Sequence, residues 1–533
     1  MKKTFKQVIA GVCVAVIAFS LTACASTENN SSNSSSDAQQ TTLAKGEYSV
    51  PSLKLAADSD RGAPNPFLQK SGGPADQKVR LIFDSLLNEG ENEMEPWLAK
   101  EWSVNGNTYT FTLNENALWH DGEKVTADDV VFTINYYKEH NPMPQLIVSG
   151  DYSGLSATAK DEYTVDITVS QNDATVLGFI GSLYILPEHI WKDVSDPKTY
   201  TDPKAFIGCG MYKYESYDSA TGAYSYVAFD DYYGPKVAAQ RVEFVPVSDS
   251  LLAFENGEID LVEMPVDAKA KYENDPSLGF INKEDDMIYK LVFNMEKVPE
   301  LKDAEVRKAI YQAIDCQAIV DNVLRSYGTA GEAGDVSPNN RFYTSNIQSY
   351  EYNPEAAKAV LEGKNILFTL TVPSSTLYTD MAEMIKMDLA AVGVTIQVES
   401  GVTGYLDKAS KGELEAVMIG HGMAGRTPEY LRTSLATKYK NTTSGHAYIG
   451  PIGWSNGEFD TLAEQNLLEL DADKRKELFQ EMQTIISEEV PVITLATHTY
   501  VYMFRKDYYD GWAKSFDYEQ FDYCRVSYLD KNQ

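Results

Sequence analysis

Residues 96–130 decide the fold, and they read PWLAKEWSVNGNTYTFTLNENALWHDGEKVTADDV. The pair Asn105-Gly106 is a strong signal for a tight hairpin turn. Apolar residues alternate with polar ones on both sides of this turn, at Trp102, Val104, Tyr109, Phe111 and Leu113. Alternation with period two is typical of strands that bury one face. We therefore predict a β-hairpin at this point.

A helix is predicted directly after the hairpin. Thr126 with Asp129 three residues later is a variant of the capping box, which marks a helix N-terminus. Val130, Val131 and Ile134 then supply an apolar face at helical spacing. A hairpin followed by a helix predicts a layer of sheet covered by helix.

The same mixture of elements continues along the chain. Strand-like patterns occur at residues 48–55, 289–293 and 366–370. Helical patterns occur at residues 304–314, 459–470 and 478–486. With 533 residues the chain is too long for one core, so we predict an α/β protein of several domains.

Ordered blocks along the chain resemble the peptide- and nickel-binding class of ABC importer solute-binding proteins, known as family 5 or oligopeptide-binding-protein-like. The matching blocks are 96–102, 109–113, 117–122 with 126–130, 208–212, 252–260, 293–294 with 306–315, 455–460, and 488–491. The resemblance spans about residues 48–533.

This resemblance implies a two-lobed periplasmic-binding-protein fold (type II, large class with an additional domain), with a hinge between the lobes. The ligand would be delivered to the permease subunits of an ABC importer, and the protein would be no enzyme. The boundaries it implies are a discontinuous first lobe of 46–80, 205–282 and 499–533, an additional domain of 81–204, and a second lobe of 283–498.

The N-terminal residues predict export and a lipid anchor. Basic Lys2, Lys3 and Lys6 precede an apolar run, and the run ends in Leu21-Thr22-Ala23-Cys24. This layout is typical of a signal peptide over residues 1–23. The last four residues resemble a lipoprotein box, which implies lipidation of Cys24 on the extracytoplasmic face of the cell membrane. Residues 24–45 are polar and predict a flexible linker.

Net charge and cysteine content restrict the kinds of partner and metal site that the chain can have. The formal net charge of −32 repels nucleic acid, so no nucleic-acid partner is expected. Cys209, Cys316 and Cys524 lack the spacing of a disulfide framework or a zinc site, and we expect buried thiols. No metal, no cofactor and a monomeric protein are predicted.

A hydrolase is the alternative of another class. Gly453-Trp454-Ser455-Asn456-Gly457 matches the G-x-S-x-G pattern of a nucleophile elbow, and His498 lies downstream. An elbow needs a strand leading directly into it, whereas Gly450-Pro451-Ile452-Gly453 predicts a loop. Ser455 also matches a helix-capping position of the binding-protein family.

Residues 415–428 contain the clearest ligand signal, and they read EAVMIGHGMAGRTP. Peptide-binding relatives carry a Trp, an Asp and an Asp-Pro pair here, and one acid holds the ligand's ammonium group. This chain has His421, Ala424 and Thr427 at those positions, with Arg426 beside them. The usual anchor for a free amino terminus is therefore missing.

This departure leaves several ligand classes open. A peptide or peptide-like ligand is the leading hypothesis, with a metal chelate of the nickel type or an oligosaccharide as alternatives. The 34 tyrosines supply amphipathic surface for any of them. The candidate ligand-binding residues are Asp58 and Asp60, which could substitute as acids, together with Cys209, His421, Met423 and Arg426.

Overall fold

The predicted hairpin forms one side of a four-stranded sheet. The computed structural model describes residues 47–57, 60–70, 77–89, 94–142, 152–422, 428–439 and 450–512. The sheet order is β4 (Ala99–Asn105), β5 (Thr108–Leu113), β7 (Thr164–Val169) and β6 (Leu155–Ala159), all antiparallel. Helix α2 (Ala127–Glu139) packs on β6 and β7, and the Thr126–Asp129 capping box is present.

A second four-stranded sheet shares a core with the first. Its order is β1 (Leu53–Ala57), β10 (Arg241–Pro246), β9 (Ala223–Ala228) and β8 (Tyr212–Asp218), in which only β1 and β10 are parallel. Both sheets contribute to one apolar cluster, with Phe111, Trp119 and Tyr226 completely buried. The small elements beside it are β2 (Leu87–Glu89), β3 (Met94–Pro96), α3 (Val176–Gly181) and α4 (Glu188–Trp191).

A seven-stranded mixed sheet organises the second half of the chain. Its order is β11 (Leu261–Glu263), β17 (Val492–Arg505), β12 (Leu278–Phe293), β16 (Ala416–Gly422), β14 (Leu367–Val372) and β15 (Thr395–Ser400), with β13 (Gly328–Ala330) also paired to β17. Ten helices of the described chain accompany it: α5 (Ser250–Glu255), α6 (Lys269–Tyr272), α7 (Ala304–Ala313), α8 (Cys316–Asn322), α9 (Pro354–Leu361), α10 (Thr376–Ala391), α11 (Tyr405–Ser410), α12 (Glu429–Leu435), α13 (Gly457–Leu468) and α14 (Ala472–Glu489).

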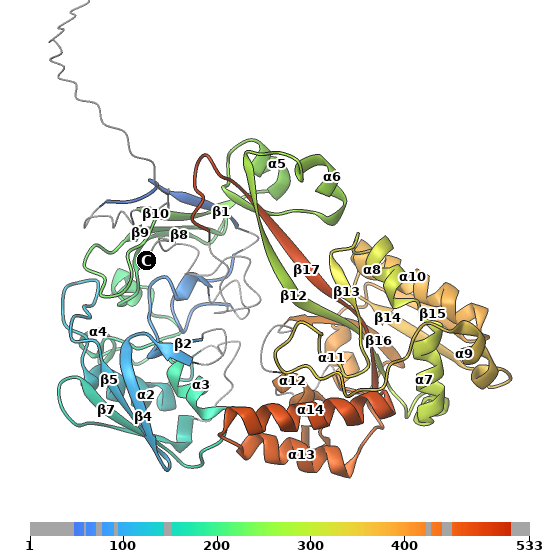
Figure 1. The fold of residues 1–533 in the computed structure, drawn as a ribbon. Helices are drawn as coiled ribbons and strands as arrows, with labels where there is room; N and C mark the ends of the chain where they lie inside the picture. The colour runs from blue at the N-terminus through green and yellow to red at the C-terminus, as the bar shows by residue number, and fades with distance from the viewer. Residues whose placement is uncertain are drawn as a thin grey trace, which may run out of the picture. The chain divides into compact units, whose positions relative to one another are not determined.

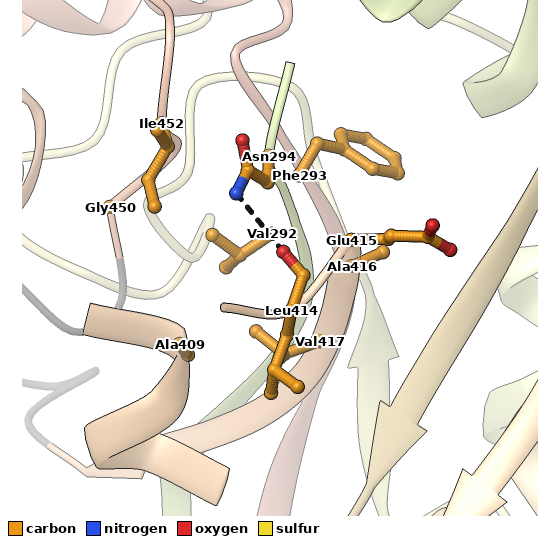
Figure 2. Close-up of a pocket in the computed structure, with 10 residues that line it drawn as sticks. All are labelled: Val292, Phe293, Asn294, Ala409, Leu414, Glu415, Ala416, Val417, Gly450 and Ile452. Carbon is orange, nitrogen blue, oxygen red and sulfur yellow. Dashed lines mark hydrogen bonds between the residues drawn. The ribbon is translucent and has the colours of Figure 1, made fainter. Parts of the chain in front are cut away.

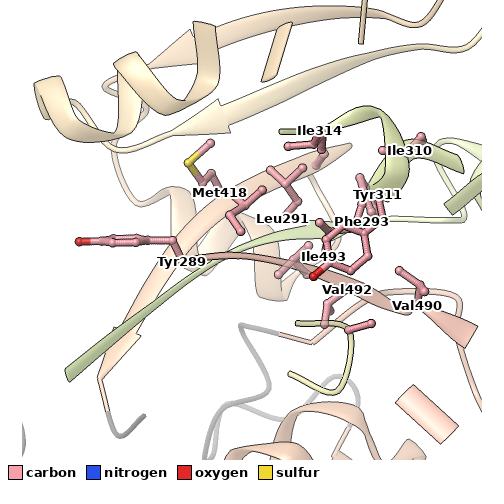
Figure 3. Close-up of a cluster of buried hydrophobic side chains, with 14 of the residues drawn as sticks. Tyr289, Leu291, Phe293, Ile310, Tyr311, Ile314, Met418, Val490, Val492 and Ile493 are labelled. Carbon is pink, nitrogen blue, oxygen red and sulfur yellow. The ribbon is translucent and has the colours of Figure 1, made fainter. Parts of the chain in front are cut away.

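The second apolar cluster lies between this sheet and its helices. It includes Leu291 and Phe293 of β12, Ile310 of α7, and Val492 and Ile493 of β17. Figure 3 shows these side chains meeting, while the ring of Tyr289 points away from the rest of the group. The sequence predicted residues 289–293 as a strand and 304–314 as a helix, and both are confirmed.

Strands β12 and β17 are long, and they connect separate cores (Figure 1). Apart from Lys290, residues 288–293 of β12 lie in the second cluster, whereas Leu278 belongs to a third, smaller cluster around α5 and α6. Along β17, Tyr502 and Phe504 reach the first cluster. The pairing of the two strands shifts register between Lys283 and Met287. A second shift lies between Tyr289 and Lys290, inside the second core. The first irregularity therefore falls between the cores and the second at the edge of the region that the candidate site uses.

The structure also bears on possible membrane-spanning helices and on the cysteines. In the part of the chain that the structure describes, no helix is both long and apolar enough to cross a membrane. Cys209 and Cys316 are free, buried thiols, as expected, while Cys24 and Cys524 lie outside the described residues.

Candidate ligand-binding site

The crossing strands present two different faces just where they leave the second core. Met287 pairs with Gly422 on one side and with His498 on the other, and Tyr289 pairs with Gly420 and Ala496. Ile288 pairs with His421 and Thr497. Because neighbouring residues of a strand point to opposite faces, Met287, Tyr289 and His498 share one face, and Ile288 and His421 share the other.

Aromatic and imidazole rings gather on the first of these faces. We call it the aromatic face: Met287, Tyr289, Tyr378, His498 and Tyr500. The Tyr289 and Tyr378 rings meet edge to face at 5.5 Å, and the His498 and Tyr500 rings lie 4.5 Å apart. Tyr289 and His498 are buried, while the other three are partly exposed. The face therefore has a closed base and an accessible rim.

Gly420 makes room for this arrangement. A Cβ atom at residue 420 would lie 2.3 Å from the Tyr378 hydroxyl and 3.1 Å from the Met287 sulfur. Both distances are shorter than a van der Waals contact allows. Tyr378, at the start of α10, can cover β16 only because residue 420 has no side chain.

The polar groups of the aromatic face are neutral. Burial lowers the pKa of His498 to about 4, and no charged neighbour contributes to that shift. The Tyr289 hydroxyl lies 3.1 Å from His498 Nδ1. This contact suits a hydroxyl that donates to Nδ1 and a ring proton on Nε2. Burial also raises the pKa of Tyr378 well above its usual value, so its hydroxyl stays protonated.

The opposite face encloses an ion pair. We call it the ion-pair face: Ile288, Lys290, Asp335, His421 and Tyr430. Lys290 Nζ lies 2.6 Å from Asp335 Oδ2, and each side chain is only 1% exposed. Thr494 donates to Asp335 Oδ1 at 2.7 Å, and the Tyr430 hydroxyl donates to the Asp335 carbonyl at 2.5 Å. Burial lowers the pKa of Lys290, which Asp335 opposes.

His421, the central residue of the sequence prediction, belongs to this ion-pair face. Its side chain is 5% exposed, its Nδ1 lies 2.9 Å from the Gly422 carbonyl, and its ring packs on Tyr430 at 4.7 Å. His421 and His498 point to opposite faces of the sheet, so the structure does not bring them together. Asp58, Met423 and Arg426 lie outside the described residues.

Asp60 and Cys209 are placed away from His421, in the first core and its border. Asp60 accepts hydrogen bonds from Lys70, Tyr217 and the Gly62 amide. Lys70 and Tyr217 lower the pKa of Asp60 to about 2. Cys209 is completely buried, and burial raises the pKa of its thiol. The Asp60 carboxylate thus has three local donors, and the Cys209 thiol is protonated and enclosed.

The residues of the hydrolase alternative do not form a catalytic pair. Ser455 is exposed, and Asn456 rather than Ser455 caps α13, accepting from the Glu458 and Phe459 amides. The loop before it bridges from Ile452 to Asn294, whereas His498 contacts Tyr289. Five residues of extended strand separate those two contacts, about 16 Å.

A small cavity lies at the far end of the same strands. Asn294, Leu414, Val417 and Ile452 are among its lining residues, and the Asn294 amide donates to the Leu414 carbonyl (Figure 2). Its interior volume is about 10 Å³, which accommodates at most one water molecule. The cavity is therefore too small for a solute.

No metal centre is formed by the side chains in the described ranges, where no group of three or more His, Cys, Asp or Glu residues is close enough. His120, which follows the hairpin, uses both ring nitrogens in the fold. Its Nε2 lies 2.9 Å from the Gly210 carbonyl, and its Nδ1 accepts from the Gly208 amide at 3.3 Å. His120 therefore has a structural role.

Sequence reasoning missed the aromatic face because its members come from β12, α10 and β17, far apart in the chain. One signal was available. His498 and Tyr500 interrupt the largely apolar run of residues 492–504, and polar rings within a buried strand are candidates for a site. Tyr378 has no comparable signal, since only the fold brings it over Gly420.

Comparisons with known proteins agree with this architecture. The chain is 27% identical over 484 residues to the dipeptide-binding protein of Escherichia coli, covering 83% of this chain and 88% of that one. It is 26% identical to heme-binding protein A of Haemophilus influenzae, covering 81% and 84%. The structure of NikZ from Campylobacter jejuni with Ni(L-His) superimposes with a TM-score of 0.69 at 21% identity, covering 86% and 95%.

The oligopeptide-binding protein AppA of Bacillus subtilis, solved with a nonapeptide, also has a TM-score of 0.69, at 19% identity and covering 90% and 99%. The solved structures confirm the two-lobed α/β fold. The sequence relatives are named as binding proteins and not as enzymes. Residues 93–443 match the model for bacterial extracellular solute-binding proteins, family 5. This chain therefore belongs to family 5 of the bacterial extracellular solute-binding proteins.

Proposed function

We propose that this solute-binding protein captures a peptide or peptide-like ligand on the aromatic face and delivers it to an ABC importer. The observation that supports the proposal is the neutral, ring-lined character of that face, where burial lowers the pKa of His498 to about 4. Tyrosine hydroxyls and a neutral imidazole suit peptide carbonyl and amide groups, and the rings suit apolar side chains. The five residues that define the aromatic face include no carboxylate to pair with a free ammonium group.

Closure of two lobes about β12 and β17 would enclose this ligand. The boundaries proposed are the first lobe at 46–80, 205–282 and 499–533, the additional domain at 81–204, and the second lobe at 283–498. One apolar cluster that runs from Ile288 to Ala496 supports the last of these. The register shift after Lys283 supports bending at that point, because an irregular ladder deforms more easily than a regular one.

A metal chelate is the second candidate. One relative is named as a heme-binding protein, and one structural neighbour was solved with a nickel–histidine complex. In this chain His421 of β16 and His498 of β17 both lie beside β12. Their opposite orientation argues against one shared ion. A chelate would need a single protein imidazole and ligands of its own, so a peptide-like ligand is favoured here.

Mass spectrometry of material released from the purified protein tests the ligand class. A peptide, blocked at its amino terminus or cyclic, is the expected result. The Gly420→Ala variant should release much less, because the added Cβ displaces Tyr378 from the binding face. An iron porphyrin or a nickel complex in the extract would replace the peptide proposal with the chelate.

Lipid anchoring through Cys24 is part of the same proposal, and the Leu21-Thr22-Ala23-Cys24 sequence supports it. Two or three acyl chains retain a protein on a membrane because each buried methylene contributes about 0.8 kcal/mol. Cys24→Ser should move the protein from the membrane fraction to the soluble fraction. Retention of the variant in membranes would exclude lipid as the anchor.

A further inference from the structure

A short turn of the additional domain contacts the helices that cover the seven-stranded sheet. Residues 171–175, which we call the latch turn, lie between β7 and α3. Asn172 fixes the turn to the hairpin, since its side-chain amide donates to the Gly106 carbonyl at 2.9 Å. Asp173 closes the turn by accepting from the Thr175 amide at 2.8 Å and from its hydroxyl at 2.7 Å. The latch turn is thus held rigidly on its own domain.

The backbone amide and carbonyl of Ala174, in this turn, both bond to the helices that cover the seven-stranded sheet. The Ala174 amide donates to the Leu467 carbonyl at 2.9 Å. Leu467 belongs to the last turn of α13, where carbonyls lack a partner inside the helix. The Ala174 carbonyl accepts from Arg475 of α14 at 3.5 Å, a long hydrogen bond. A residue of one core therefore satisfies a helix end that belongs to another.

The two sides of this contact belong to different apolar clusters. Val176 and Phe179, just after the latch turn, are buried in the first cluster. Phe459, Leu462 and Ala463 of α13 are buried in the second. In sequence the contact is distant from β12 and β17, which also join these cores. The contact is therefore a second, independent link between them, within the one compact unit to which the described residues 47–512 belong.

Arg475 extends this link to α12. Its Nη2 lies 3.8 Å from Glu429 Oε1, and Glu429 also pairs with Arg432 at 2.6 Å. Burial opposes the charge of Arg432, but Glu429, Tyr439 and the latch-turn residue Asp173 raise its pKa. Helix α12 also carries Tyr430, whose ring packs on His421 and whose hydroxyl bonds Asp335. One helix thus connects the latch contact to the ion-pair face.

We propose that the latch turn and Arg475 form a latch that holds the two lobes together on the side away from the crossing strands. Motion about β12 and β17 must break the Ala174–Leu467 hydrogen bond, so this bond sets part of the resistance to opening. Arg475 positions the contact, because its guanidinium holds the Ala174 carbonyl on one side and Glu429 on the other. The role is independent of which ligand the protein binds.

Amide exchange of the ligand-free protein tests this directly. In the full chain the Ala174 amide should be protected, and Arg475→Ala should reduce that protection by about tenfold, as loss of a hydrogen bond from a charged group implies. The radius of gyration in solution scattering should rise at the same time. Lys474→Ala is the matched control, because Lys474 is an exposed cation on the same turn of α14. It should change neither quantity.

A disulfide cross-link across the contact is a second test, which remains informative if the Arg475→Ala variant does not fold. With Cys24 and Cys524 replaced by serine, Ala174→Cys with Leu467→Cys should oxidise to a disulfide and abolish the increase in radius of gyration on adding Arg475→Ala. An Ala174 amide that exchanges in the wild type as fast as an unstructured amide would overturn the proposal. Failure of the cysteine pair to cross-link, or an Arg475→Ala variant with unchanged protection, would overturn it as well.

Discussion

The aromatic face and the ion-pair face are built from alternate residues of the same strands, yet their chemistry is opposite. Tyr289 and His498 are neutral and lie behind a partly exposed rim. Lys290 and Asp335 are charged and 1% exposed, with Thr494 and Tyr430 as further partners. The aromatic face has neutral hydrogen-bonding groups beside solvent-exposed residues, whereas the charges of the ion-pair face are buried.

This difference assigns the two faces different roles. A buried ion pair contributes little net stability, but removal of one partner leaves a charge without compensation. The ion-pair face therefore fixes the loop of Asp335 and helix α12 against the crossing strands. The aromatic face has no charge to satisfy, so it can lose water to a ligand at low cost. We therefore propose that the ion-pair face positions the lobe and that the aromatic face binds the ligand.

The largest expected effect is on the ion-pair face. Lys290→Met leaves the Asp335 carboxylate buried without its cation, and should lower the free energy of unfolding by about 3–5 kcal/mol. Denaturant titration at pH 7 measures this loss. Ligand affinity, measured on the fraction that remains folded, should change little.

The double variant Lys290→Met with Asp335→Asn is the control. It removes both charges, and asparagine tolerates the positive φ of 60° at residue 335. The double variant should be more stable than Lys290→Met alone, by at least about 1 kcal/mol of coupling. A double variant as unstable as the sum of the two single ones would show that the pair is not an interacting unit.

The second effect concerns pH and the aromatic face. The pKa of His498 is lowered to about 4 in the folded protein, against 6.5 in a model peptide. Between these pH values His498 is protonated in the unfolded chain but neutral in the folded protein. The free energy of unfolding is therefore highest above about pH 6.5 and falls as the pH decreases toward 4. The loss is on the order of 3 kcal/mol at most. His498→Gln should flatten this part of the stability curve.

His120 provides the comparison for that measurement, since burial lowers its pKa to about 4 as well. It belongs to the first core, on the opposite side of the crossing strands. His120→Gln should flatten the same pH window without weakening ligand binding, whereas His498→Gln should do both. Equal effects of the two variants on binding would remove His498 from the site.

The smallest effect on stability, and a specific one on binding, is expected at Gly420. The Cβ atom of Gly420→Ala would meet the Tyr378 hydroxyl. Tyr378 is partly exposed and can move aside, so stability should fall by only about 1 kcal/mol, the lower end of overpacking costs. Affinity for the co-purified ligand should fall about tenfold. Ala416→Gly, farther along β16, is the matched control for a change in strand backbone.

Much of the fold could be predicted from local sequence. The hairpin and the Thr126 capping box form as predicted, and the helical patterns at 304–314 and 459–470 match α7 and α13 within two residues. The full length of β12 was missed, because the polar residues 283–286 interrupt its apolar pattern. That strand is long because it pairs with β17 in two cores, which is a tertiary property.

The site was less predictable. The sequence singled out residues 415–428. Of these, 416–422 pair with β12, whereas 423–427 lie outside the described residues. Period-two alternation alone could have placed His421 and Gly420 on opposite faces of the strand. It could not have predicted which side chains cover each face. Tyr378 and Tyr430 reach β16 from different helices, and only long-range packing determines which face each one covers. Sequence patterns report local periodicity and are silent on such pairings.

The central claim is that the aromatic face recognises a peptide-like ligand without pairing a free ammonium group. Calorimetric titration with a tripeptide and its N-acetylated form, on the wild type and on Gly420→Ala, tests it most directly. We predict that the acetylated form binds the wild type at least as tightly as the free peptide, and that Gly420→Ala weakens its binding about tenfold, or 1.4 kcal/mol. Tight binding of the free peptide that acetylation abolishes, unchanged in Gly420→Ala, would contradict the account.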